Sequence, residues 1–574
     1  MRLLLQEYVG MMKEESELES VVSSLVTSMG LDVLSLPQKG VRQNGVDIHA
    51  VGVDPSDNQR KNFLITIKQG NITRTSWDGS NQAVRTSLNQ ILDVYSQNNI
   101  PAGDKGNITK IILCCGGELK QEIQADWTGY QNSNAAKGFQ FELWNGSVLS
   151  SLIEEHLLNE NIFIEDIKKK MRRTLVVLSD YGYDLSHYKE MLNEFLFNTN
   201  WKSLTGNSLE KKAIKALSMI PVCLGMIHEY SKEANNSKHP LFASEFTLLR
   251  VWDFIQKNKL EKSDKIFAIY NQIFGMYSNY GAEFFNKTYP HTQVPDGITI
   301  YCRNSITASE VVFEHIGILG SLGLSQALWG IASQEKKYLE NAKAISDSLK
   351  NVISNNGISG SPCFDEMTTD IALAVFLLYI NGETDFIKEW FFDIVQRFSY
   401  SYCVLGKGFP IGYDSIETLV EFEKEKEQTN EDMSSTSMLL ALICYWCVIL
   451  DDKKLYPELV DFIETKLPHC TVQMWFPRKG IKDHIYASYA AHEFGIAEAP
   501  IHLPKSIDEL RERLLKFIDF SKKSEAFETV WNDSAPALPL IASRHFRTPV
   551  IPFFWLGHIE KSEDSTPLKD KEKG

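Results

Sequence analysis

Positive charge, paired cysteines and long apolar runs are all scarce in this chain of 574 residues. It carries 59 lysines and arginines against 74 acidic residues, a net charge of −15. An acidic surface repels phosphate, which excludes a protein that wraps nucleic acid over much of its surface. Any contact with nucleic acid must therefore be local, assisted by a metal ion, or helped by a partner.

The nine cysteines form no recognisable metal-binding set. Cys444 and Cys447 are three residues apart, but they lie inside the apolar run Met438–Leu450, and no second pair completes a zinc site. We therefore predict that both pack in a core. That run of 13 residues is the longest apolar one and is shorter than the roughly 20 residues of a membrane-spanning helix.

Two further motifs are absent. Glu7 interrupts the short apolar stretch at the start, and no secretory cleavage site follows it. No G-x-x-x-x-G-K-[ST] phosphate loop is present, which excludes a P-loop ATPase. We expect a cytoplasmic protein with reduced thiols and no contact with a membrane.

The patterning divides the chain into three parts, as the length also requires. Residues 1–158 mix strand and helix signals, and residues 159–558 are dominated by helical periodicity. The second part is either one helical array or two sub-domains that divide near 357–362. Residues 559–574 are predicted to be a disordered tail, because they are charged and almost free of apolar residues.

The first part predicts an α/β domain around a mixed central sheet. Apolar residues recur at helical spacing at its start, and short β-type runs follow, separated by Gly, Pro and Asn clusters. The predicted helices are 17–29, 81–95 and 146–158, and the predicted strands are 32–36, 46–53, 63–68, 109–115 and 139–144.

Two residues of neighbouring strands carry the chemical signal. Asp47 lies early in one strand and Lys68 near the end of the next, with Glu19 on the preceding helix. A carboxylate and a lysine brought together in this way can hold a divalent cation and orient a water molecule for phosphodiester cleavage. Each also has a plain structural interpretation: Asp47 as a turn residue after Asn44-Gly45, and Lys68 as a lysine that protects an edge strand.

These segments resemble the PD-(D/E)XK restriction-endonuclease superfamily, most closely its Mrr-type branch, over residues 17–158. The resemblance rests on L-E-S-V-V-S-S-L-V-T-S-M-G-L-D-V, G-V-R-Q-N-G-V-D-I-H-A, I-T-I-K-Q-G and F-E-L-W-N-G-S-V-L-S-S-L-I, in that order. It implies a restriction-endonuclease-like fold and a nuclease that uses Mg²⁺ or Mn²⁺.

The resemblance also implies roles for residues. Asp47 and Glu19 would bind the metal, Lys68 would orient or activate the attacking water, and Glu17 or the backbone carbonyl of Ile67 would assist. The chain departs from the pattern at Thr66, where the family has Glu, Asp or Gln, so one metal contact is missing or comes from elsewhere. Further candidates are Gln69 beside the lysine and, for contact with nucleic acid, Arg42, Arg74 and Trp77.

Two interpretations of the whole chain follow. In the first, a metal-dependent endonuclease, with DNA as the expected substrate, is joined to a helical module that senses a ligand or partner protein. Such fusions resemble effectors of bacterial anti-phage defence, and an oligomer is compatible with this interpretation. In the second, the nuclease fold is catalytically inactive and serves as a nucleic-acid-binding or scaffold protein.

Overall fold

The protein is described by a computed structural model. It covers residues 6, 9–10, 12, 14, 18–35, 43–80, 83–135, 138–157, 165–180, 182–197, 201, 204–406, 431, 434–488, 493, 495–498, 503–521 and 537–559. The chain divides into two compact units, Met1–Tyr277 and Ser278–Gly574. The predicted domain boundary after residue 158 falls inside the first unit and stays a prediction, as does the division near 357–362. The predicted tail, apart from Ile559, lies outside the described residues.

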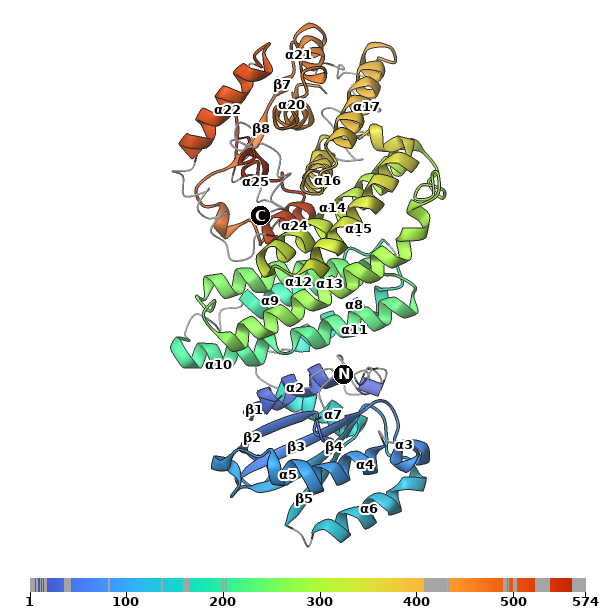
Figure 1. The fold of residues 1–574 in the computed structure, drawn as a ribbon, viewed down its shortest axis with the longest axis vertical. Helices are drawn as coiled ribbons and strands as arrows, with labels where there is room; N and C mark the ends of the chain where they lie inside the picture. Colours follow the sequence, from blue (N-terminus) through green and yellow to red (C-terminus); the bar gives the residue numbers. More distant parts are fainter. Residues whose placement is uncertain are drawn as a thin grey trace, which may run out of the picture. The chain divides into compact units, whose positions relative to one another are not determined.

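A mixed sheet of five strands forms the start of the first unit, as predicted (Figure 1). The strands lie side by side in chain order: β1 (Asp32–Ser35), β2 (Ile48–Val53), β3 (Arg60–Lys68), β4 (Ile108–Cys115) and β5 (Phe139–Trp144). Strands β1, β2 and β3 pair antiparallel, whereas β3, β4 and β5 pair parallel. The parallel strands therefore all end at one edge of the sheet, which we call the carboxyl edge.

Helices cover both faces of this sheet (Figure 1). Helices α2 (Glu19–Ser28) and α7 (Gly146–Leu152) lie on one face, and α3 (Arg74–Asp78), α4 (Val84–Gln90) and α6 (Gln121–Ala135) lie on the other. The second face packs a core of side chains from β3, β4 and these helices, which includes Leu64, Leu88, Leu113 and Trp127. Burial on both faces explains why β4 reads as a continuous apolar run.

Helices α3 and α6 of this sheet-bearing part were not revealed by the sequence pattern. Helix α6 is mostly polar and buries only Ile123, Trp127 and Asn134. A single pair of apolar residues four apart is too weak a signal to separate a helix from a polar loop. Helix α4 continues as a π-helical turn, Ile91–Tyr95, so the predicted helix 81–95 is confirmed from residue 84 onward.

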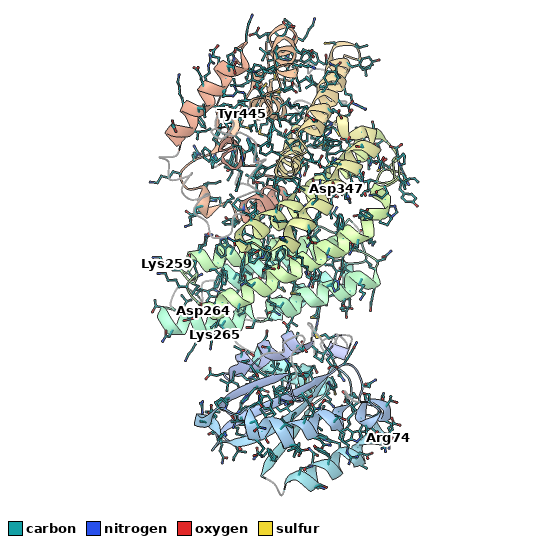
Figure 2. All side chains as sticks on the ribbon, viewed as in Figure 1. Arg74, Lys259, Asp264, Lys265, Asp347 and Tyr445 are labelled. Atoms are coloured by element: carbon teal, nitrogen blue, oxygen red, sulfur yellow. The ribbon has the colours of Figure 1, made fainter. Side chains whose placement is uncertain are left out.

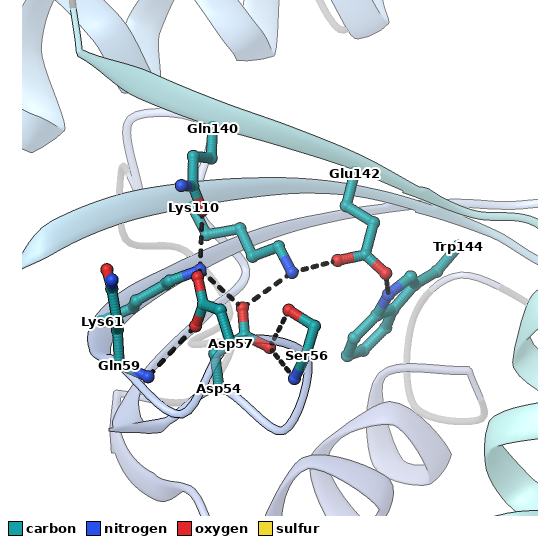
Figure 3. A network of polar contacts seen from close by, with 9 residues as sticks. All are labelled: Asp54, Ser56, Asp57, Gln59, Lys61, Lys110, Gln140, Glu142 and Trp144. Carbon is teal, nitrogen blue, oxygen red and sulfur yellow. Dashed lines mark hydrogen bonds and ion pairs between the residues drawn. The ribbon is translucent and has the colours of Figure 1, made fainter.

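At the end of the sheet opposite the carboxyl edge lies a buried network of polar side chains (Figure 3). Asp54 Oδ2 accepts hydrogen bonds from Lys61 Nζ at 2.9 Å and from Lys110 Nζ at 2.8 Å. The Lys61 and Asp54 side chains are only 1% and 4% exposed. The network also includes Ser56, Asp57, Gln59, Gln140, Glu142 and Trp144. It ties the β2–β3 hairpin loop to β4 and β5.

The rest of the first unit is helical. Its helices are α8 (Glu165–Val177), α9 (Ser186–Phe197), α10 (Gly206–Leu217), α11 (Ile220–Glu233), α12 (Lys238–Lys257) and the first half of α13 (Asp264–Thr292). The basic run 167–173 lies on α8, where Lys170 Nζ pairs with Glu194 of α9 at 2.5 Å. Arg172 and Arg173 of the same run are exposed to solvent.

The second unit is mostly helical, with two small sheets that the all-α prediction missed. Its helices include α14 (Ser305–Ser333), α15 (Lys336–Asn355), α16 (Thr368–Ile380), α17 (Thr384–Cys403), α20 (Met438–Leu450), α21 (Leu455–Lys466), α22 (Ile507–Ser521), α24 (Leu538–Phe546) and α25 (Phe553–Leu556). Strands β6 (Thr436–Ser437) and β7 (Thr471–Val472) form one sheet. Strands β8 (Met474–Pro477) and β9 (Gly495–Glu498) form the other. The strands are only two to four residues long, too short for a period-2 pattern.

Helix α20 is a core helix, and α14 is another. Cys444 and Cys447 of α20 are buried free thiols, as predicted, and burial raises the pKa of both. Among the described residues α14 alone is long and apolar enough to cross a membrane, and 83% of its most apolar window is buried inside the protein. That burial is typical of a core helix.

A buried ion pair joins α24 to α16. Arg547 follows α24, and its terminal nitrogens donate to the two oxygens of Asp370 at 2.9 and 2.8 Å. Asp370 is 1% exposed, and Arg544 nearby is 5% exposed. The basic segment Ser543–Arg547 is therefore part of the helical core.

Candidate active site at the carboxyl edge

The carboxyl edge brings together the ends of three strands. Lys68 ends β3 and lies opposite Cys115, the last residue of β4, while Trp144 ends β5. Because β2 runs antiparallel to β3, β2 starts at this same edge. Asp47, directly before β2, is thereby carried to the side of Lys68, as the sequence predicted.

A tight turn fixes Asp47. Gly45 has φ +82°, and a Cβ on it would lie 2.2 Å from the carbonyl oxygen of Ser87, so only glycine fits there. The backbone N–H of Asp47 then donates to the Ile65 carbonyl at 2.9 Å. Its Oδ2 accepts the backbone N–H of Ile67 at 2.6 Å. Asp47 is thus held against β3 through both its backbone and its side chain.

Lys68 is paired with a carboxylate that the sequence reasoning did not assign. Lys68 Nζ lies 2.8 Å from Glu14 Oε1, and the backbone N–H of Gln69 donates to Glu14 Oε2 at 3.2 Å. The Lys68 side chain is 16% exposed and that of Glu14 is 34% exposed, so the pair sits at the surface of the edge. Glu14 belongs to the acidic run before α2, and nothing in the sequence distinguished it from its neighbours.

The approach of the N-terminal segment to this edge depends on Gly116. A Cβ at that position would lie 2.4 Å from the carbonyl oxygen of Val9. Gly116 therefore lets the segment that carries Glu14 cross close to the ends of the strands, while Gly117 allows the close approach of Gly70 and Asn71 after β3. The Gly116-Gly117 pair was the available signal for a close backbone approach.

The electrostatics of Asp47 show which charges gather around it. Burial raises the pKa of Asp47 to about 6, although the Ile67 hydrogen bond and the Lys68 charge lower it. The negative charges of Glu14 and Glu19 raise it further. The structure therefore brings Asp47, Lys68 and Glu19 into one electrostatic neighbourhood and adds Glu14 to them.

Thr66 is buried beside the candidate site. It shares a face of β3 with Lys68, two residues away, but it is 1% exposed. Its hydroxyl oxygen is buried and has no hydrogen-bond partner among the described residues. The position to which the resemblance assigns a metal-binding side chain is therefore closed to solvent in this chain.

The carboxylates fit a hard divalent cation by their chemistry. Mg²⁺ is usually bound by one or two carboxylates, with water and substrate phosphate completing its shell. Burial, with smaller contributions from the charges of Glu14 and Glu19, raises the pKa of Asp47, and a bound cation would stabilise its ionised form. Within the described part of the chain, no group of three or more His, Cys, Asp or Glu has the arrangement of a metal centre. The fit is therefore to a site of two carboxylates.

The candidates for contact with nucleic acid differ in their exposure to solvent. Trp77 is 1% exposed and packs edge-to-face on Trp127 and Tyr130, so the prediction that it contacts nucleic acid is wrong. Arg74 lies on the exposed side of α3 (Figure 2), where its guanidinium is 2.7 Å from Asp126. Gln69 is exposed. Arg42 and Glu17 lie outside the described residues.

Comparison with protein-family models, curated proteins and solved structures gives no match to this chain.

Proposed function

We propose that the sheet-bearing part of the first unit is a metal-dependent nuclease that hydrolyses phosphodiester bonds, with DNA as the expected substrate. The observation that supports it best is the meeting of Asp47, Lys68 and Glu14 at the carboxyl edge, within reach of the charge of Glu19. In α/β sheets, the ends of parallel strands are where ligands bind. The order of the elements agrees with the restriction-endonuclease-like resemblance, and that finer fold assignment is part of the proposal.

Each residue has a defined task in this proposal. Asp47 and a glutamate, Glu14 or Glu19, hold Mg²⁺ or Mn²⁺, with the Ile67 carbonyl as a further ligand. When bound, the cation polarises the phosphoryl oxygen and lowers the pKa of a bound water. Lys68 places its ammonium beside the scissile phosphate and offsets the negative charge that develops in the transition state.

Glu14 also sets the position of Lys68. Its two oxygens hold the lysine ammonium and the Gln69 backbone, so the lysine side chain has one defined direction at the edge. A substrate phosphate would compete with Glu14 for the same ammonium. The expected cycle is exchange of Lys68 from Glu14 to phosphate as substrate binds.

The helical remainder is proposed to regulate or target this activity. The net charge of −15 and the neutralisation of Arg74 by Asp126 leave little basic surface for DNA near the site. Recognition of DNA would then be local or assisted by a partner protein. A role as an effector of bacterial anti-phage defence rests on analogy with similar domain combinations alone.

The test is cleavage of supercoiled plasmid by the full chain with Mg²⁺ or Mn²⁺. We expect Lys68→Ala and Asp47→Ala each to reduce the cleavage rate by at least about a hundredfold. Removing one group that stabilises charge in a transition state typically has an effect of this size. Lys105→Ala is the matched control, because Lys105 is an exposed lysine of the same domain and lies away from the strand ends. Equal rates in all four proteins would overturn the proposal.

The alternative is a nuclease fold that binds nucleic acid or a scaffold partner without cutting. The closed position of Thr66 favours it, since the family's second carboxylate is missing there. Binding of labelled duplex by wild type, Lys68→Ala and Asp47→Ala alike, without cleavage in either ion, would support this alternative.

Thr66→Val separates the two roles of that position. If Glu14 or Glu19 replaces the missing carboxylate, the Thr66 hydroxyl does no chemistry and the variant should cleave at the wild-type rate. Removing a buried hydroxyl without a described partner should leave stability unchanged or raise it by about 1 kcal/mol. Plasmid cleavage and thermal unfolding measure both, and a large loss of cleavage in a folded variant would assign the hydroxyl a catalytic role.

A further inference from the structure

The second unit contains a cavity of about 410 Å³ at the C-terminal half of α17. The other wall is the 3₁₀ turn Gly357–Gly360 and the two residues after it. The lining residues are Gly360, Ser361, Pro362, Gln396, Arg397, Phe398, Tyr400, Ser401 and Leu405. A volume of this size is in the range of small-molecule sites.

One wall of the cavity is rigid. A Cβ on Gly360 would lie 2.1 Å from Asp393 Oδ2 and 2.7 Å from Arg397 Nε, so the backbone of the turn rests directly on this ion pair. Trp390 Nε1 donates to the Ser359 carbonyl at 3.0 Å, and Ser359 Oγ donates to the Ile353 carbonyl at 2.8 Å. A fixed wall lowers the entropy cost of binding a ligand there.

Arg397 is oriented by its own helix. Its Nε lies 2.8 and 2.9 Å from the two oxygens of Asp393, one turn earlier on α17. A guanidinium has five N–H donors, and this pairing uses only the one on Nε. Among the described residues, the terminal nitrogens Nη1 and Nη2 make no hydrogen bond, and the side chain is 44% exposed. Asp393 fixes the arginine and is itself not part of the lining.

The polar lining is rich in hydrogen-bond donors and contains no carboxylate. Ser361, Ser401, Tyr400 and Gln396, whose side chains carry hydroxyl or amide groups, line the cavity together with Arg397. Leu405 and Tyr400, which are 54% and 57% exposed, supply apolar surface. Several donors around one guanidinium suit the three acceptor oxygens of a phosphate better than the two of a carboxylate. The apolar surface suits a flat ring attached to it.

We propose that this cavity binds a small organic phosphate, a phosphate monoester joined to a flat ring, with Arg397 as the phosphate anchor. The inference does not depend on the nuclease proposal. It gives the helical region a specific ligand class to sense.

The experiment is calorimetric titration of the full chain with adenosine 5′-monophosphate, adenosine and inorganic phosphate as probes. We expect saturable binding of the monophosphate, and binding about tenfold or more weaker for each of the other two probes. Arg397→Gln should weaken monophosphate binding by about tenfold or more, because a hydrogen bond to a charged group is lost. Arg513→Gln is the matched control: Arg513 is 50% exposed and pairs with Glu509 four residues earlier on its helix.

A second variant, Ser401→Phe, keeps Arg397 and fills the cavity, and it should also weaken binding. Circular dichroism and thermal unfolding check that both variants are folded. The inference is overturned if millimolar monophosphate does not bind. It is also overturned if inorganic phosphate binds as tightly as the monophosphate, or if folded Arg397→Gln binds like wild type.

Discussion

The pKa values of two aspartates of the same sheet are shifted in opposite directions: that of Asp47 is raised and that of Asp54 is lowered. Asp54 lies between two lysines at one end, and Asp47 lies beside a lysine and two glutamates at the other. Hydrogen bonds from Lys110, Ser56 and Lys61 stabilise the ionised form of Asp54, whereas burial, more than the two glutamates, disfavours the ionised form of Asp47. A raised carboxylate pKa of this kind is characteristic of functional sites, where a group that is unfavourable for stability can serve catalysis.

Asp47→Asn should stabilise the protein at neutral pH when divalent cations are absent. The pKa of Asp47 is raised in the folded state to about 6, so stability falls as the pH rises from about 4 to about 6 and stays lower above that. An amide oxygen can still accept the Ile67 N–H. We expect a gain of about 2–3 kcal/mol at pH 8 and almost none at pH 4. Urea unfolding in EDTA at both pH values measures this, and a loss of stability at pH 8 would contradict it.

Asp54→Asn should have the opposite effect. Burial alone would raise the pKa of Asp54, but hydrogen bonds from Lys110, Ser56 and Lys61 more than reverse this and hold it well below its usual range. Its contribution to stability is therefore present above about pH 4 and is lost as the pH falls. We expect the variant to lose about 3 kcal/mol at pH 7, because two lysines remain near each other without their shared partner.

The control for this prediction is Asp57→Asn, which removes only one contact to Lys61 from a side chain that is 35% exposed. Its effect should be clearly smaller than that of Asp54→Asn. Equal effects of the two substitutions in denaturant unfolding would show that the network does not centre on Asp54.

At the scale of elements, the sheet was largely predictable from the sequence, and the reason is physical. Strand β5 was predicted with both ends correct, and β4 differs by one residue, because turn residues punctuate runs of apolar and β-branched side chains. Asp47 and Lys68 followed from strand order. Helix α6 and the pairing of Glu14 with Lys68 did not follow, because one lacks an apolar stripe and the other depends on how a distant segment crosses the strand ends.

Gly116→Ala tests that crossing. The added methyl would meet the Val9 carbonyl, so the N-terminal segment must shift and Glu14 should move away from Lys68. We expect a stability loss of about 1–3 kcal/mol from overpacking, together with slower cleavage. Gly103→Ala is the control, since no atom lies within 4 Å of its added methyl. Wild-type cleavage by Gly116→Ala would show that the position of this segment does not matter.

At the scale of the whole molecule, acidity limits how DNA can be held. A chain with a net charge of −15 should neutralise few phosphates, so the affinity for duplex DNA should depend weakly on salt. We expect a slope of log K against log[NaCl] no steeper than about −3, which corresponds to about three phosphate contacts. Fluorescence anisotropy of a labelled duplex measures this slope. A slope of about −6 or steeper would show that the protein has a larger basic surface for DNA and would contradict the prediction.

The helical region shows what sequence patterns miss at this scale. The positions of many helices were predictable from periodicity, but the contacts between segments far apart in the sequence were not. Asp365 accepts the Met438 and Leu439 backbone N–H groups at the start of α20, and Asp370 binds Arg547 from a segment 177 residues away. Charged residues are expected to be exposed to solvent, and only the fold shows which of them pair with one another inside a core.

The central claim is that the carboxyl edge holds a divalent cation on Asp47 and a neighbouring glutamate. The most direct measurement is Mn²⁺ binding to the full chain, followed by electron paramagnetic resonance of the free ion, which needs no substrate or activating signal. The account predicts saturable binding that Asp47→Asn weakens by about tenfold or more and Asp57→Asn leaves unchanged. Equal Mn²⁺ affinity in wild type and both variants, or no binding by wild type at millimolar Mn²⁺, would contradict it.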